Sequence, residues 1–186
     1  MKKKITALVM AAAMCLSVAA CGSDNGGSGD TAKDTYTVGI CQLVQHDALD
    51  AATKGFRDAL TEELGDKVEF VEQNAANDIP TCGTICNGFV SDGVDLILAN
   101  ATPALQAATA ATQSIPILGT AVTEYGVALD IENFSGTVGG NVSGTSDLAP
   151  LDQQAAMFSE LLPDAKTVGI LYCSAEANSV YQGRRS

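Results

Sequence analysis

The sequence is poor in basic residues and histidine, and it lacks the short motifs of several common catalytic classes. Ten Lys and Arg stand against 22 Asp and Glu, so the formal net charge is −12 with the one histidine neutral. A chain this acidic is a poor candidate for binding nucleic acid or anionic lipid through charge. It contains no P-loop, no GxGxxG, no HExxH and no glycine-rich nucleophile elbow. We therefore expect neither catalysis nor a bound cofactor.

The cysteines do not form a recognisable metal-binding motif. Cys82 and Cys86 are spaced to lie one helical turn apart, but there is no CxxC and only one histidine to complete a site. We expect no metal, and we interpret Cys41, Cys82, Cys86 and Cys173 as small, buried, free thiols. Spacing alone does not decide whether two of them form a disulfide outside the cytoplasm.

Residues 1–20 have the pattern of a bacterial signal peptide. Residues 2–4 are lysines, and residues 5–16 form an apolar run that is too short to span a bilayer. The following LSVAAC resembles a lipobox, which implies cleavage before Cys21 and a lipid on its sulfur. The alternative is an ordinary soluble signal peptide with an Ala-x-Ala-like site. No second hydrophobic run of spanning length follows. We therefore expect an extracytoplasmic protein, anchored to the bacterial cell membrane by a lipid on Cys21.

Residues 21–35 are rich in Gly, Ser and Asp and have no apolar anchor. This composition is typical of a flexible tether between a membrane anchor and a folded domain.

From Tyr36 onward, apolar runs alternate with helical patterns. Strands are expected at 36–44, 67–74, 94–100 and 115–122, and helices at 47–64, 78–93 and 102–114. The helices are expected to begin with Asp47 and Thr102 as N-caps, and to end at Gly65 and Gly93. This alternation predicts a three-layer αβα, doubly wound parallel sheet. The next stretch, 123–148, has weak β character and no helical period.

The sequence TVGI occurs at 37–40 and again at 167–170. The second copy follows a helical pattern at 151–166, lies in an apolar run expected to be a buried strand at 167–173, and precedes another helical pattern. We interpret 36–146 as an N-terminal α/β lobe with its hinge-side segment, and 147–186 as the incomplete start of a second lobe. The expectation is a C-terminally truncated two-lobed protein. The alternative is one larger sheet in which the repeat is coincidental.

Ligands of open α/β sheets bind beyond the carboxyl ends of the strands. Thr102, at a helix start, could offer its hydroxyl and nearby N–H groups to a carboxylate, or act only as an N-cap. Glu176 could pair with a ligand ammonium, or be a solvated acid. His46 is expected to bind ligand or cap a helix, since no nucleophile accompanies it. The full set of predicted ligand-binding residues is Gln42, His46, Thr102, Thr120, Ala121, Thr123, Glu176 and Asn178.

Five segments together resemble one family: GICQLVQHDALDAATKGF, DLILANATPALQA, IPILGTAV, GGNVSGTSD and KTVGILYCSAEANS, in this order. They resemble the ABC-transporter substrate-binding proteins of the tryptophan-binding type, over about residues 36–181. The resemblance implies a type I periplasmic-binding-protein fold, whose two lobes close on a small molecule and deliver it to a membrane permease. It also implies an amino-acid ligand, often aromatic, and we expect a monomer. The alternatives are a ligand-sensing lipoprotein that reports to a membrane receptor, and an α/β-fold enzyme.

Overall fold

The computed structural model describes residues 33–185. Its centre is a five-stranded sheet with the order β2-β1-β3-β4-β5, in which every neighbouring pair is parallel. The strands are β1 (Tyr36–Gln42), β2 (Val68–Asn74), β3 (Leu96–Asn100), β4 (Ile117–Val122) and β5 (Val142–Ser146). The predicted signal peptide, the lipid site at Cys21 and nearly all of the predicted tether lie outside the described residues.

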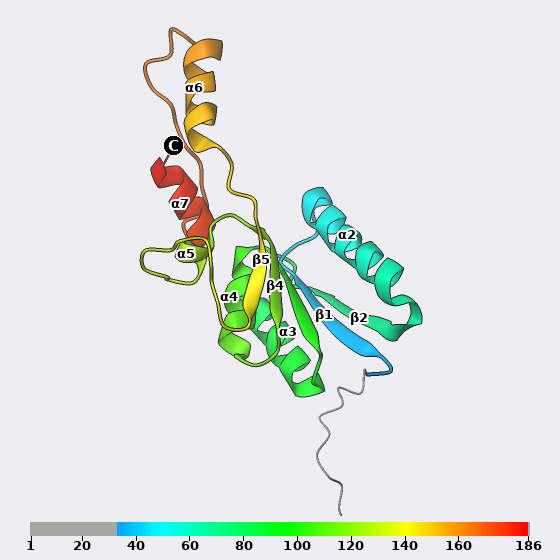
Figure 1. The fold of residues 1–186 in the computed structure, drawn as a ribbon. Coiled ribbons are helices and arrows are strands. Elements are labelled where there is room, and N and C mark those ends of the chain that lie inside the picture. Colours follow the sequence, from blue (N-terminus) through cyan, green and yellow to red (C-terminus); the bar gives the residue numbers. More distant parts are fainter. Residues whose placement is uncertain (1–32, 186) are drawn as a thin grey trace, which may run out of the picture. The chain divides into compact units, whose positions relative to one another are not determined.

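Helices cover both faces of this sheet, as Figure 1 shows. On one face lies α2 (Asp47–Leu64), whose Phe56 and Leu60 pack against Val38, Ile40 and Leu98. On the other face lie α3 (Ile79–Asp92) and α4 (Thr102–Ala111), which bury Phe89 and Leu105 in the larger core cluster. The predicted three-layer α/β architecture is confirmed.

The helix ends predicted at Gly65 and Gly93 are confirmed, but α4 ends at Ala111 instead of residue 114, and two predicted helix starts are wrong by one residue. Gly65 and Gly93 cap α2 and α3, both with positive φ. The N-cap of α2 is His46, not Asp47, because the extended backbone stops one residue earlier and the His46 side chain accepts from the Ala48 N–H. Thr102 is the first residue of α4 instead of its cap, because β3 turns into the helix within the single residue Ala101.

The stretch after β4 contains one short helix that the sequence did not predict, α5 (Tyr125–Ala128), before it joins the sheet as β5. The Glu124 carboxylate caps α5 by accepting from the N–H groups of Gly126 at 3.0 Å and Val127 at 2.7 Å. A helix of one turn carries no hydrophobic period, so its pattern could not be read.

The last part of the chain contains α6 (Leu151–Leu161) and α7 (Ala177–Arg185), where helices were expected. The predicted buried strand at 167–173 is wrong. This segment has no strand pairing among the described residues, and Leu171 is 101% exposed. Cys173, which was expected to be buried, is exposed as well. An apolar run forms a strand only when a neighbouring strand completes its hydrogen bonds.

Candidate functional site

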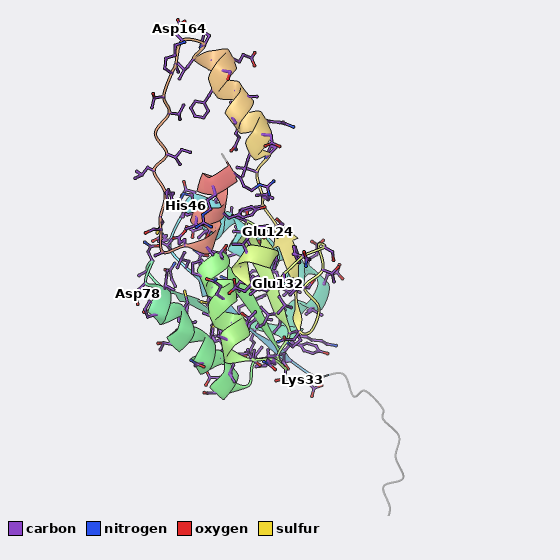
Figure 2. All side chains as sticks on the ribbon, turned by 90° about the vertical axis from the view of Figure 1, so that its left-hand side faces the viewer. Lys33, His46, Asp78, Glu124, Glu132 and Asp164 are labelled. Atoms are coloured by element: carbon purple, nitrogen blue, oxygen red, sulfur yellow. The ribbon has the colours of Figure 1, made fainter. Side chains whose placement is uncertain are left out.

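The carboxyl ends of three parallel strands lie side by side at one edge of the sheet. Gln42 at the end of β1 is in register with Asn100 at the end of β3, and Asn100 with Thr120 of β4. His46 and Glu124, which follow β1 and β4, both lie near the upper end of the sheet in Figure 2. The topology therefore brings the residues predicted after these strands to one end of the fold.

Gln42 uses its whole amide group within the protein. Its Nε2 donates to the Val44 carbonyl at 2.9 Å and to Asp50 Oδ1 at 2.6 Å. Its Oε1 accepts from Thr53 Oγ1 at 2.7 Å and from Asn100 Nδ2 at 3.4 Å. Two donors and two acceptor positions are all that a glutamine side chain has. In this structure Gln42 therefore connects α2 to the sheet and positions the edge of the site.

Two buried polar atoms near the start of α4 have no hydrogen-bond partner. Asn100 is fully buried, and its Nδ2 donates to the Leu49 carbonyl and to Thr53 Oγ1, but its Oδ1 has no partner. Thr102 is 2% exposed, and its Oγ1 also has no partner. An unsatisfied buried group costs about 1–3 kcal/mol, so such atoms are rare and often mark a functional role.

The backbone between these two residues is strained. Ala101 has φ 98° and ψ 157°, in a region that is essentially restricted to glycine and costs about 1–3 kcal/mol. The Ala101 N–H donates to the Thr120 carbonyl at 3.0 Å, which holds this turn against β4. The first-turn N–H groups of α4 have no intrahelical acceptor, and the helix dipole favours an anion there. Strain of this kind clusters at ligand-binding sites.

The end of β4 is irregular where three of the predicted residues lie. The pairing with β5 shifts register between Gly119 and Val122, and Ala121 has φ 51°. Thr120 is half-buried, whereas Thr123 is buried and its Oγ1 accepts from Gln182 Nε2 of α7 at 3.2 Å. These contacts bring α7 to the end of β4.

His46 is exposed, and one of its ring nitrogens already accepts a hydrogen bond. Its Nδ1 accepts from the Ala48 N–H at 3.2 Å, so the neutral ring carries its hydrogen on Nε2. His46 thus presents a hydrogen-bond donor to solvent at the entry of α2.

Glu176 and Asn178 lie at the beginning of α7 and are half-buried. Glu176 Oε2 accepts from Asn178 Nδ2 and from Ser179 Oγ, each at 3.4 Å. Asn178 Oδ1 is buried without a partner. The two long hydrogen bonds to Glu176 leave its carboxylate capacity for a stronger donor.

A groove of about 630 Å³ lies beside α5 and α7, lined among others by Glu124, Asp130, Phe134 and Tyr181, and it includes none of the eight predicted residues. Sequence reasoning missed Asp50, Thr53 and Glu124. None of the three had a local signal, since glutamate is not among the residues that favour the N-cap position.

Two further properties concern residues 33–185 only. No group of three or more His, Cys, Asp or Glu among them could hold a metal ion. None of the helices in this part of the chain is long and apolar enough to cross a membrane.

Comparison with known proteins shows a family match and a related protein. A family model described as ABC transporter substrate binding protein matches residues 37–185. A tyrosine-binding protein of Clostridioides difficile (strain R20291) is 42% identical in an alignment 193 residues long, which covers 97% of this chain and 55% of that protein. The chain therefore spans about half the length of the curated relative it matches.

Two solved structures agree in fold. One is the ABC domain in complex with L-Trp from Streptococcus pneumonia, with TM-score 0.75 and 36% identity, covering 81% of this chain and 51% of that one. The other is the ligand-free, open structure of a substrate-binding protein with adhesive properties from Clostridium difficile. It has TM-score 0.64 and 42% identity, covering 81% of this chain and 52% of that one.

Proposed function

The chain belongs to the ABC transporter substrate-binding protein family, and on that premise we propose that it captures an amino acid at the carboxyl ends of β1, β3 and β4. The parallel sheet with helices on both faces is similar in fold to the L-Trp-bound relative, with TM-score 0.75 over 81% of this chain. Proteins of this family work outside the cytoplasm. The names of its relatives mention tyrosine and L-Trp, so an aromatic amino acid is the proposed ligand class.

The carboxylate of the amino acid is proposed to bind at the start of α4. The observation that carries this assignment is the buried, unpartnered Thr102 Oγ1 beside the strained residue Ala101. A hydroxyl and first-turn N–H groups are donors, and the helix dipole adds a favourable potential for an anion. A carboxylate would satisfy the donor that this chain leaves unmatched.

The ammonium of the amino acid is proposed to bind Glu176, with Asn178 beside it. Asn178 Oδ1 is an unpartnered acceptor, and an ammonium carries three donors. Thr102 and Glu176 belong to segments that we assign to different lobes. A ligand that bridges them would favour the closed arrangement of those lobes, because it interacts with both only when they are close.

Lipid attachment at Cys21 and delivery of the amino acid to a membrane permease complete the proposed function. The supporting observations are the lipobox-like LSVAAC sequence and the family match. Action as a monomer is proposed with them. A neighbouring sensor kinase gene in place of permease and ATPase genes would favour a sensing lipoprotein instead.

A comparison of ligand analogues tests the carboxylate site. L-Tyrosine should bind by calorimetry, and tyramine, which lacks the carboxylate, should bind roughly ten-fold or more weakly. Thr102→Val should lower the affinity for L-tyrosine but leave the affinity for tyramine unchanged. The ratio of the two affinities should therefore become smaller. Thr109→Val is the matched control, because the Thr109 hydroxyl bonds to carbonyls within the same helix.

The same variants separate binding from folding. Because Thr102→Val removes an unpartnered polar atom, the free energy of unfolding should not fall. An unchanged preference for L-tyrosine over tyramine in Thr102→Val would contradict the assignment.

A further inference from the structure

One buried threonine contacts the chain on both sides of the proposed boundary between the lobes. Thr123 follows β4 directly and is 6% exposed. Its carbonyl accepts from Ser146 Oγ at 2.7 Å, at the end of β5, where the chain leaves the lobe assigned to residues 36–146. Its Oγ1 accepts from Gln182 Nε2 of α7 at 3.2 Å, from a residue 59 positions further along the chain. Thr123 therefore joins the two segments by hydrogen bonds.

The residues on either side of Thr123 are held by hydrogen bonds of their own. The Val122 carbonyl accepts from the Asp147 N–H at 3.0 Å. The Glu124 carboxylate accepts from two N–H groups of α5 and so caps that helix. The backbone around Thr123 is thus anchored in β5 and in α5, and its hydroxyl has a fixed position from which to bind α7.

α7 lies against α5, as Figure 1 shows. Tyr181 of α7 lines the same groove as Val127 of α5 and the nearby Phe134. The helix is half-buried from Ala177 to Gly183. Apolar contacts of this kind are not directional, whereas a hydrogen bond forms only in a narrow range of distance and angle. The bond from Gln182 to Thr123 therefore selects one orientation of α7.

That orientation determines which side of α7 faces the end of β4. Asn178 and Gln182 are four residues apart on the helix, so they lie on the same face. A helix held through Gln182 at the end of β4 therefore turns Asn178 towards this edge of the sheet. Glu176 lies beside Asn178, since its Oε2 accepts from Asn178 Nδ2 at 3.4 Å. These are the two residues assigned above to the ammonium of the ligand.

We propose that Thr123 is a positioning residue for the ammonium site: its hydroxyl holds α7 at the end of β4 and thereby presents Glu176 and Asn178 to the ligand. Thr123 acts through Gln182 instead of touching the ligand, because its hydroxyl is buried and already bound. The inference rests on the proposed amino-acid site. It adds a residue of the first lobe that controls ligand contacts made by the second.

Two ligands that differ only in the ammonium test this role. Calorimetry of the full chain compares L-tyrosine with desaminotyrosine, which keeps the carboxylate and the ring but lacks the ammonium. Thr123→Val should weaken binding of L-tyrosine about two- to ten-fold, the loss expected for one hydrogen bond, and leave binding of desaminotyrosine unchanged. Thr123→Ser keeps the hydroxyl and should bind both ligands as the wild type does. A purely structural defect would weaken both ligands alike.

Hydrogen exchange measures the contact without any ligand. Mass spectrometry of the peptide that contains α7 should show exchange about two- to ten-fold faster in Thr123→Val and in Gln182→Leu than in the wild type. The double variant should exchange no faster than the faster single variant, because both changes remove the same hydrogen bond. Thr109→Val is the matched control, since its hydroxyl bonds stay within α4. Gln182 is half-buried, so Gln182→Leu tests the contact even if Thr123→Val fails to fold.

The outcomes separate this inference from the proposed function. Equal affinity of the wild type for L-tyrosine and desaminotyrosine would contradict the ammonium site itself. A wild-type preference for L-tyrosine that Thr123→Val retains in full would overturn the role of Thr123 and leave that site in place. Unchanged exchange of α7 in both single variants would overturn it as well.

Discussion

The Tyr125 hydroxyl donates to the Gly119 carbonyl at 3.0 Å and thereby fastens the short helix α5 to strand β4. The same hydroxyl lies 3.2 Å from the Thr145 carbonyl of β5. A Cβ added at Gly119 or at Gly144 would collide with this hydroxyl, so the contact depends on glycine in both strands. Tyr125 thus links β4 and β5 through its hydroxyl in the segment where their regular pairing is interrupted.

We expect Gly119→Ala to lower the free energy of unfolding by about 1–3 kcal/mol, because the new methyl group overpacks against Tyr125. Tyr125→Phe alone should cost about 1 kcal/mol for the lost hydrogen bonds. The double variant should cost less than the sum, since removing the hydroxyl makes room for the methyl group. Urea unfolding of the three variants measures this coupling. Strict additivity would show that the collision does not occur.

Stability should decline at high pH through Tyr125. Burial, with a smaller contribution from Asp147, raises the pKa of Tyr125 to about 12. Because this folded-state pKa exceeds the ordinary value of 10, the stabilisation is fully present below about pH 10 and is lost as pH rises towards 12. The free energies of unfolding of wild type and Tyr125→Phe, measured with urea at several pH values in this range, should become more similar as the pH rises. Parallel curves would contradict the raised pKa.

The Gln42 network should depend on the hydroxyl of Thr53. Thr53 Oγ1 donates to Gln42 Oε1 and accepts from Asn100 Nδ2, and the residue is 4% exposed. Thr53→Val keeps the shape but breaks both bonds, so we expect a loss of about 1–3 kcal/mol in the free energy of unfolding. Thr109→Val, the half-buried helical control, should change it by about 0.5 kcal/mol or less. Equal effects in the two variants would exclude a special role for the network.

Gly39→Ala should destabilise the packing of α3 on β1. The added Cβ would lie 2.7 Å from the ring of Phe89, which is fully buried in the core. We expect a loss of about 1–3 kcal/mol, measured by chemical unfolding. Phe89→Leu in the Gly39→Ala background should recover part of this loss. If Phe89→Leu recovers none of the lost stability, the strain does not come from the contact with the Phe89 ring.

The alternation of strands and helices, the parallel sheet and the ends of α2 and α3 were predictable from the sequence. Each depends on a local pattern: apolar runs for β1, β3 and β4, helical spacing for α2, and glycine at 65 and 93. The helix starts at Asp47 and Thr102 were predicted one residue off, because cap geometry depends on how sharply the preceding strand turns. The strand at 167–173 failed because pairing is not a local property.

The candidate site, like the fold, was predictable from the sequence only in part. Parallel strand ends must share an edge of the sheet, so the sequence by itself determined that Gln42, Thr102 and Thr120 come to one end of the fold. Only the tertiary structure decided that the Gln42 amide is used up by Asp50, Thr53, Val44 and Asn100, while Thr102 Oγ1 is buried without a partner. The reason is physical: residue types and their spacing are written along the chain, whereas the partners of a buried polar atom come from segments that are distant in sequence and are chosen by packing.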